Sequence, residues 1–191
     1  MTLRFTETTL PGVILIEPVV FEDDRGFFME TYHMGKYAEA GIGQGFVQDN
    51  HSHSERFTLR GLHYQLNHPQ GKLVYVITGE ILDVAVDIRR GSPMFGRWTA
   101  TLLSDRNKRQ LFIPAGFAHG FCVLSETADV IYKCTDLYAP GDEYGVLWSD
   151  PTIDIVWPVE NPILSEKDAK NPELNHIHEE DLPLYEKPGH E

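Results

Sequence analysis

Short stretches in which apolar side chains alternate with polar ones, or form β-branched and aromatic runs, follow one another along most of the chain. Such stretches are typical of β-strands, and the Gly, Pro, Asn and Asp residues between them are typical of turns. The segments with this pattern are 12–21, 26–33, 45–54, 57–66, 72–79, 80–89, 97–103, 109–114, 118–125, 128–136 and 153–158. We therefore predict many short strands with brief connections.

Helical signals are sparse. We predict two short helices, over residues 34–40 and 165–170. Ser165 is a suitable N-cap for the second helix, and Asp168 follows it at the position that completes a capping box. Many short strands with so little helix indicate an all-β sandwich or barrel.

The chain has 191 residues, which suits one domain with a sizeable core. We expect this domain to span residues 1–171. Residues 172–191 are polar and contain proline. We expect them to form a loosely packed C-terminal tail.

One predicted strand, 80–89, carries acids in an apolar segment. Gly79 and Glu80 precede its apolar positions and are expected to form a tight hairpin turn with the strand before them. The apolar side chains at even positions share one face, whereas Asp83 and Asp87 lie on the other. These acids must therefore lie in water, at the mouth of a cavity or beside a partner.

Acidic side chains outnumber basic ones, and the formal net charge is −13. A surface of this charge repels nucleic acids and anionic membranes, so we expect neither as a partner. A small phosphorylated ligand is still compatible, provided that basic side chains gather in one pocket. The candidate cations are Arg25, Arg60, Lys72 and Lys167.

The two cysteines, Cys122 and Cys134, lie in apolar segments without metal-ligand spacing. We predict buried, reduced thiols. No segment approaches the ~20 apolar residues that cross a bilayer, and the N-terminal residues lack the pattern of a secretion signal. The expected compartment is the cytoplasm.

Two histidines on predicted strands have informative surroundings, although a single strand histidine is more often structural than catalytic. The segment 114–121 places His119 in the second motif of the cupin superfamily, Pro-x-Gly-x-x-His. His63, in the segment 60–65, matches the first histidine of the other cupin motif. This resemblance implies a cupin fold, a double-stranded β-helix or jelly roll with a few short helices.

The first cupin motif is altered where metal ligands would stand. Gln65 replaces the second histidine, and Lys72 stands seven residues before Gly79, where the motif has a glutamate. A divalent cation requires imidazole and carboxylate ligands, so an ammonium and an amide are poor substitutes. We expect no metal and no other cofactor.

Further motifs make the resemblance narrower. The matching pieces are Arg25-Gly26-Phe27-Phe28-x-Glu30, Gln48-Asp49-Asn50, 60–65, Lys72, 79–93, 114–121, Tyr132-Lys133, Tyr138-x-Pro140, Glu143 and 165–168. In this order and spacing they resemble the dTDP-4-dehydrorhamnose 3,5-epimerase family over nearly the whole chain to about residue 170. The resemblance implies an isomerase of dTDP-rhamnose biosynthesis that acts on a dTDP-linked 4-keto-6-deoxyhexose.

The implied reaction converts dTDP-4-dehydro-6-deoxy-D-glucose to dTDP-4-dehydro-L-rhamnose through an enolate. The C4 ketone makes the protons on C3 and C5 acidic, so inverting these carbons needs a base and an acid on opposite faces of the sugar. By resemblance, His63 is the base and Tyr132 is the acid. Without the resemblance, Tyr132 would be interpreted as a core tyrosine.

Two further residues have implied roles in catalysis. By resemblance, Asp168 orients His63, and Lys72 stabilises the enolate oxygen. The alternative for Asp168 is the helix cap described above, and one carboxylate could hardly serve both roles. We also expect that Asp83 holds Lys72 in place.

The resemblance also implies a set of side chains that bind the nucleotide sugar. They are Arg25, Phe27, Glu30, Gln48, Asn50, Arg60, His119, Tyr138, Glu143 and Lys167. The cations are expected at the diphosphate or the sugar, and the two aromatic rings beside the thymine.

Members of the resembled family are homodimers in which N-terminal strands cross between subunits. By resemblance, residues 25–30 then serve the partner's pocket, and 12–21 is the crossing strand or, alternatively, an internal edge strand. Arg60 and His63 are separated by an odd number of positions, which in a regular strand places them on opposite faces. A bulge at Gly61, or a contact with a neighbouring subunit, would resolve this.

Three other functions remain open at this stage. The nearest is an epimerase that inverts only C3 or only C5 of a similar sugar. A metal-dependent cupin, an oxygenase or isomerase, is disfavoured by Gln65 and Lys72. A cupin that binds nucleotide sugars without catalysis would not need the base, orienting acid and proton donor together.

Overall fold

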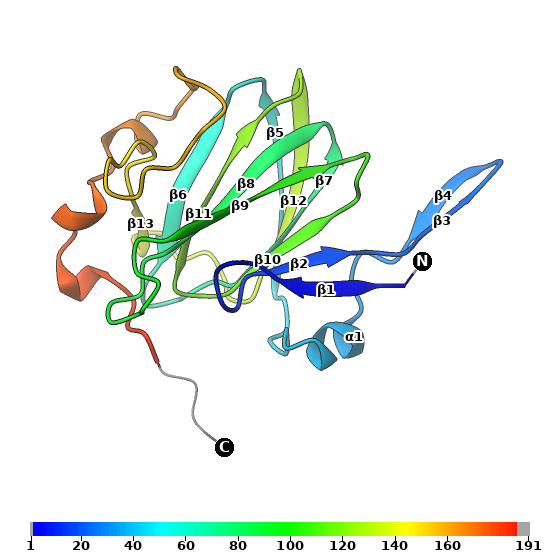
Figure 1. The fold of residues 1–191 in the computed structure, drawn as a ribbon, viewed down its shortest axis with the longest axis horizontal. Coiled ribbons are helices and arrows are strands. Elements are labelled where there is room, and N and C mark those ends of the chain that lie inside the picture. Colours follow the sequence, from blue (N-terminus) through cyan, green and yellow to red (C-terminus); the bar gives the residue numbers. More distant parts are fainter. Residues whose placement is uncertain (1, 187–191) are drawn as a thin grey trace.

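Two antiparallel β-sheets, stacked face to face, form the body of the protein, which a computed structural model describes over residues 2–186 (Figure 1). The first sheet consists, in spatial order, of β1 (Arg4–Glu7), β2 (Ile14–Glu17), β10 (Gln110–Ile113), β7 (Lys72–Thr78), β12 (Thr127–Cys134) and β5 (Gln48–Glu55). The second consists of β13 (Glu143–Gly145), β6 (Leu59–Gln65), β11 (Phe117–Val123), β8 (Glu80–Asp87) and β9 (Trp98–Ser104). The predicted all-β class is confirmed.

Apolar side chains from both sheets fill the space between them. Val74 and Val130 of the first sheet and Ala85 and Phe121 of the second belong to one buried cluster. Val84, on the opposite face of β8 from Ala85, belongs to a second cluster with side chains from the C-terminal third of the chain. Because both of its faces are buried, β8 carries apolar side chains on both of them.

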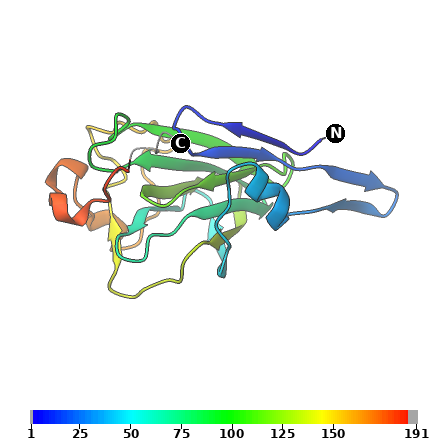
Figure 2. The same cartoon turned by 90° about the horizontal axis from the view of Figure 1, so that it is seen from below.

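A hairpin of β3 (Val20–Asp23) and β4 (Gly26–Met29) projects from the sandwich (Figure 1, Figure 2). The predicted single strand 12–21 is therefore two strands, β2 and β3. Pro18 lies between them, and proline has no N–H to donate to a sheet. The break redirects the chain from the first sheet into the hairpin.

Helices are few, as predicted. The helix expected over 34–40 is confirmed as α1 (Met34–Glu39), where His33 Nδ1 accepts the N–H of Lys36 at 3.4 Å. The other predicted helix, 165–170, is only a 3-10 turn, η1 (Asp168–Lys170). No helix within residues 2–186 is long and apolar enough to cross a membrane.

The predicted strand 153–158 is wrong, and β1 and β13 were not predicted. The apolar side chains of Ile153, Ile155 and Trp157 alternate because they pack on the second buried cluster from one side. Their backbone forms no sheet pairing, and this segment is turn and irregular structure. An alternation of apolar and polar residues indicates that one side of a segment is buried, and this does not require pairing with a neighbouring strand.

The predicted hairpin at Gly79 and Glu80 is also wrong. β7 pairs with β10 and β12, whereas β8 pairs with β11 and β9, so the chain crosses from one sheet to the other at this point. Gly79 has φ of +83°, a conformation that favours glycine. Gly79 therefore has a turn conformation, as expected, but it connects two sheets and not two strands of a hairpin.

The expected loose tail is wrong over residues 172–186. This segment contains η2 (Leu174–His176) and η3 (Glu179–Asp181), and Leu174 and Leu182 are buried in the second cluster. The rest of the predicted tail, residues 187–191, lies outside the described residues. Cys122 and Cys134 are buried free thiols, as predicted.

Candidate active site

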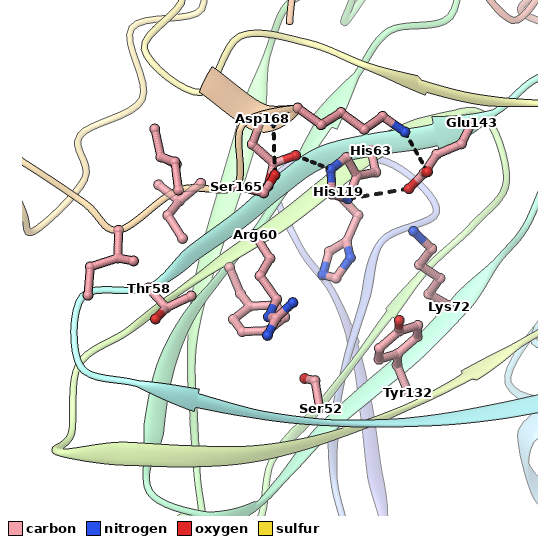
Figure 3. Close-up of a pocket in the computed structure, with 15 residues that line it drawn as sticks. Ser52, Thr58, Arg60, His63, Lys72, His119, Tyr132, Glu143, Ser165 and Asp168 are labelled. Carbon is pink, nitrogen blue, oxygen red and sulfur yellow. Dashed lines mark hydrogen bonds and ion pairs between the residues drawn. The ribbon is translucent and has the colours of Figure 1, made fainter. Parts of the chain in front are cut away.

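A cavity of about 510 Å³ opens between the two sheets (Figure 3). Side chains from strands of both sheets and from the segment 163–168 line it. A smaller cavity of about 240 Å³ shares four of its lining residues: His63, Lys72, Tyr132 and Glu143. The two cavities therefore form one continuous cleft, and these four side chains lie where they meet.

His63 and Asp168 form a close pair in this cleft. Nε2 of His63 lies 2.6 Å from Oδ1 of Asp168, whose side chain is buried. Burial alone would raise the pKa of Asp168, but the hydrogen bond and charge of His63, with the N–H of Gly61, outweigh it and lower that pKa. The carboxylate is thus held ionised beside the imidazole.

Asp168 also takes part in the predicted cap, through its backbone. Its N–H donates to Ser165 Oγ at 3.1 Å, which is the N-cap contact expected of Ser165. This leaves the carboxylate for His63. Only the Ser165 contact of the predicted capping box is therefore present, and the carboxylate of Asp168, for which the two roles were alternatives, pairs with His63.

Tyr132 and Lys72 reach the same space from the other sheet. Figure 3 shows both side chains pointing into the cavity, across from His63. Burial raises the pKa of the Tyr132 hydroxyl, which keeps it protonated at neutral pH. Burial lowers the pKa of the Lys72 ammonium, opposed by the charges of Cys134, Glu143 and Asp83.

We had expected Asp83 to hold Lys72 in place, but its hydrogen-bond partner is His119. Its Oδ1 lies 2.7 Å from Nε2 of His119, on the neighbouring strand. Asp87, the other acid on this face of β8, forms an ion pair of 2.6 Å with Arg89. Both acids are fully buried and each has a partner, which is one of the outcomes predicted for this face.

Arg60 and His63 both line the cavity, although an odd number of positions separates them in the sequence. The pairing of β6 with β11 shifts register between His119 and Phe121, at the level of Gly61. Gly61 has φ of +124°, and an added Cβ would lie 2.6 Å from the Cα of Gly120. The predicted bulge at Gly61 is therefore confirmed.

The smaller cavity is lined by a connected group of predicted ligand-binding residues. Glu143 forms an ion pair with Lys167 and accepts a hydrogen bond from the Tyr138 hydroxyl at 3.3 Å. The backbone N–H of Tyr138 donates to Gln48 Oε1 at 2.8 Å, and Gln48 donates to Asn50 at 3.0 Å. These contacts hold the polar groups in place before any ligand binds.

Three of the predicted binding residues lie elsewhere. Arg25 pairs with Asp23 in the projecting hairpin, and the ring of Phe27 lies 4.1 Å from the Lys108 ammonium. Glu30 likewise pairs with a surface lysine. None of the three lines the cleft of the described chain.

Some lining residues were not predicted. They are Ser52, Thr58, Leu59, Phe121, Ile163 and Leu164. Ser165 also lines the cavity, although we had predicted it only as an N-cap. Ser52 could have been found, because it alternates with Gln48 and Asn50 along β5 and so shares their face. Ile163 forms an isolated β-bridge with Thr58 and Leu164 lies in irregular structure, for which the sequence has no comparable pattern.

The residues of the altered cupin motif do not fit a metal ion. Gln65 donates to the carbonyl oxygens of His68 and Leu137 and accepts the N–H of Ala139, so its amide is committed to the backbone. Lys72 brings an ammonium to the position of the motif's carboxylate. Within residues 2–186, no group of three or more His, Cys, Asp and Glu side chains is arranged to hold a metal ion.

Comparisons with known proteins agree on one family. A sequence profile of dTDP-4-dehydrorhamnose 3,5-epimerases matches residues 7–176. The dTDP-4-dehydrorhamnose 3,5-epimerase of Pseudomonas aeruginosa is 56% identical over 170 residues, which cover 88% of this chain and 94% of that protein.

Solved structures of such enzymes share the fold. The dTDP-6-deoxy-D-glucose-3,5-epimerase of Legionella pneumophila, in complex with dTDP-4-keto-L-rhamnose, superposes with a TM-score of 0.95, at 49% identity over 97% of this chain and 100% of that one. A 3'-monoepimerase from Streptomyces bikiniensis, in complex with dTDP-quinovose, has a TM-score of 0.88 and 33% identity, covering 93% and 92%. The predicted cupin-type jelly roll is confirmed.

Proposed function

The chain belongs to the dTDP-4-dehydrorhamnose 3,5-epimerase family, and we propose that it converts dTDP-4-dehydro-6-deoxy-D-glucose to dTDP-4-dehydro-L-rhamnose by inverting C3 and C5. It is an isomerase. The observation that carries the proposed mechanism is the pair of His63 with Asp168 on one wall of a cavity whose opposite wall presents Tyr132. Two-sided proton transfer requires this arrangement.

In the proposed reaction, His63 removes the proton from C3 or C5 on one face of the sugar. The electron pair moves into the C4 carbonyl and forms an enolate. Tyr132 then donates its proton to the same carbon from the other face. Burial keeps Tyr132 protonated until that step, because it raises the pKa of the phenol. Exchange with solvent returns the proton from His63 and restores Tyr132.

Lys72 is the proposed donor to the enolate oxygen. Its side chain lies beside those of His119 and Tyr132 in the cavity (Figure 3). It forms no ion pair within residues 2–186, so its N–H groups are available to a ligand. A donor directed at the oxygen that becomes negative stabilises the transition state more than the substrate.

The nucleotide is proposed to bind along the rest of the cleft. Arg60 and Lys167 line the larger cavity and supply cations for the diphosphate, which the acidic surface would otherwise repel. Tyr138 lines the smaller cavity with its ring half exposed, which suits stacking on thymine. Gln48, Asn50 and Glu143 supply hydrogen-bonding groups beside it.

The projecting hairpin supports a homodimer. Phe27 and Phe28 are 56% and 71% exposed, which is unfavourable unless another surface covers them. A second copy would cover these rings and could receive Arg25 and Glu30 in its own cleft. Light scattering should then give twice the chain mass, and Arg25→Ala should raise KM. A fully active monomer would contradict this part of the proposal.

Proton NMR in heavy water with dTDP-4-dehydro-6-deoxy-D-glucose tests the reaction. We expect deuterium at both C3 and C5 of the product, whereas an epimerase of one carbon would give a single labelled carbon. His63→Ala should abolish turnover and leave dTDP binding within about threefold. Binding without exchange at either carbon in the unmodified protein would leave only a nucleotide-sugar-binding function.

A further inference from the structure

The segment that carries Asp168, residues 163–172, contains no strand and is attached to the second sheet at both of its ends. At its start, Ile163 forms an isolated β-bridge with Thr58, immediately before β6. At its end, the carbonyl oxygen of the last residue accepts the N–H of Leu147 at 2.8 Å. Figure 3 shows the carboxylate of Asp168, between these two attachments, directed at the proposed base.

Asn171, at the end of the turn η1, packs against the backbone of Gly145 in β13. In a 3-10 turn, residues three positions apart lie on the same side, so Asn171 and Asp168 both face β6 and β13. A Cβ added to Gly145 would lie 2.5 Å from both Cγ and Oδ1 of Asn171. Gly145 is paired directly with His63, and residues paired in this way project on the same face of a sheet. The amide of Asn171 therefore fills the place beside His63 that a side chain at position 145 would take.

Close packing holds this amide in place. Its Nδ2 is buried and forms no hydrogen bond within residues 2–186. A buried donor without an acceptor is unfavourable, so hydrogen bonding of Nδ2 does not explain the position of Asn171. The φ of Gly145 lies outside the positive region, so the conformation of the chain does not require glycine there. The contact with Asn171 is what requires a residue without a side chain at position 145.

We propose that the contact between Asn171 and Gly145 positions the base for the epimerisation: it fixes the turn η1, and with it the carboxylate of Asp168, relative to His63. This inference rests on the proposed function. The hydrogen bond of 2.6 Å between Asp168 and His63 tolerates little displacement, because hydrogen bonds weaken steeply with distance and angle. Neither Asn171 nor Gly145 lines the cleft, so both are positioning residues that act through Asp168.

Gly145→Ala is the direct test, because the added methyl group must displace the amide of Asn171 and the turn that carries it. We expect kcat to fall about 10²-fold, the loss that follows a misplacement of about 1 Å. The dissociation constant for dTDP should change less than about fivefold. In proton NMR, the short hydrogen bond between His63 and Asp168 should give a far-downfield resonance in the unmodified protein, and this resonance should be lost in the variant.

Asn171→Ala supplies a compensating change. By itself, it removes the group that supports η1, and kcat should fall about tenfold because Asp168 is held less firmly. Combined with Gly145→Ala, it removes the atoms that the new methyl group would meet. The double variant should therefore turn over about tenfold faster than Gly145→Ala alone. A double variant that is no faster than Gly145→Ala would overturn the inference.

A variant cycle with Asp168→Asn shows whether the effect passes through the carboxylate. In that background the orienting group is already lost, so Gly145→Ala should lower kcat by less than about a further threefold, and losses that multiply would contradict the inference. Gly91→Ala is the matched control, because Gly91 has φ of +84°, lies outside the cleft and has open space around the new Cβ. Backbone strain should make this variant less stable, but kcat should stay within about twofold.

The inference is also overturned if Gly145→Ala folds and turns over at the unmodified rate. If that variant does not fold, Asn171→Ala decides, because it adds no atoms: the inference requires a lower kcat and a weaker downfield resonance of the proton between His63 and Asp168. Isotope exchange at C3 and C5 by the unmodified protein separates the two proposals. Its absence defeats the proposed function itself, whereas exchange with no effect of these variants defeats only the role of Asn171 and Gly145.

Discussion

His63 and Asp168 are separated by 105 positions in the chain, yet Nε2 of the imidazole lies 2.6 Å from Oδ1 of the carboxylate. β6 holds the histidine, and the turn η1 holds the acid. With Nε2–H donated to Asp168, the ring keeps its lone pair on Nδ1. The carboxylate oxygen Oε1 of Glu143 lies 4.0 Å from Nδ1, beyond hydrogen-bond distance. The lone pair on Nδ1 is therefore available to remove a proton.

Asp168→Asn should therefore lower kcat more than it weakens binding. An amide can present its NH₂ group to Nε2 and hold the ring in the opposite tautomer, which places N–H where the base should be. We expect kcat to fall about 10²–10⁴-fold and the affinity for dTDP to change little. Glu166→Gln, two residues away and 97% exposed at the side chain, is the control and should keep full activity. Equal kcat values for both variants would rule out the orienting role.

Gly61→Ala should disrupt the register on which the site depends. The added Cβ would lie 2.6 Å from Cα of Gly120 and 2.7 Å from the carbonyl oxygen of His119, and φ is +124°. Backbone strain and overpacking together should lower the free energy of unfolding by roughly 2–5 kcal/mol. Gly43→Ala, where nothing lies within 4 Å of the new Cβ, should change it by less than about 0.5 kcal/mol. Urea denaturation measures both, and a stable, active Gly61→Ala variant would contradict the prediction.

Local patterns were sufficient to predict most of the strands and the residues that share a face. β8 shows why: its apolar residues Leu82, Val84 and Val86 share one face, and the buried acids Asp83 and Asp87 on the other face both have partners, as solvation energetics require. The same rule did not identify the partner of Asp83. Lys72 and His119 are both basic and both line the cavity, and only the strand order, which places β11 beside β8, selects His119.

Long-range connections explain the remaining errors. Gly79 has the conformation of a turn glycine, but local sequence does not specify which sheet the next strand joins. The segment after residue 171 looks polar because only isolated side chains, such as Leu174 and Leu182, are buried. Arg25 and Phe27 were assigned to the ligand by resemblance, and a single chain does not bring them to the cleft.

Asp150 should make stability depend on pH. Burial alone would raise its pKa, but hydrogen bonds from Thr152, Leu174 and Ile153 outweigh burial and lower the pKa below 3.8. The ionised form therefore stabilises the folded state fully above about pH 3.8, and this contribution is lost as the pH falls through the folded pKa.

Asp150→Asn tests this directly by urea denaturation between pH 7 and pH 3. At pH 7 the variant should be less stable by about 1–3 kcal/mol, and the difference should shrink below pH 4. The exposed Asp154→Asn is the control and should show no such convergence. A difference that stays constant down to pH 3 would show that the charge of Asp150 is not responsible.

Activity should survive removal of divalent cations. Gln65 is engaged by three backbone groups, and Lys72 occupies the position where a metal-binding cupin has a carboxylate. Proton transfer by His63 and Tyr132 requires no Lewis acid. Incubation with a chelator followed by desalting should leave kcat within about twofold, and added zinc or manganese should not increase it. A rate that falls on chelation and returns with one metal would contradict the proposed chemistry.

Tyr132→Phe should separate proton removal from inversion. His63 and its partner Asp168 are untouched by this change, so the C–H bonds at C3 and C5 can still break. Without the phenol, the proposed proton donor on the opposite wall is missing, and the enolate is reprotonated on the face from which the proton was removed. In heavy water, we expect recovered substrate to gain deuterium with retained configuration, while formation of the inverted product slows about 10²–10⁴-fold. Tyr75→Phe, on the adjacent strand β7 and outside the cleft, should leave both rates unchanged. Loss of isotope exchange together with inversion would mean that Tyr132 acts before the proton leaves carbon, and the assignment of acid and base would have to be reversed.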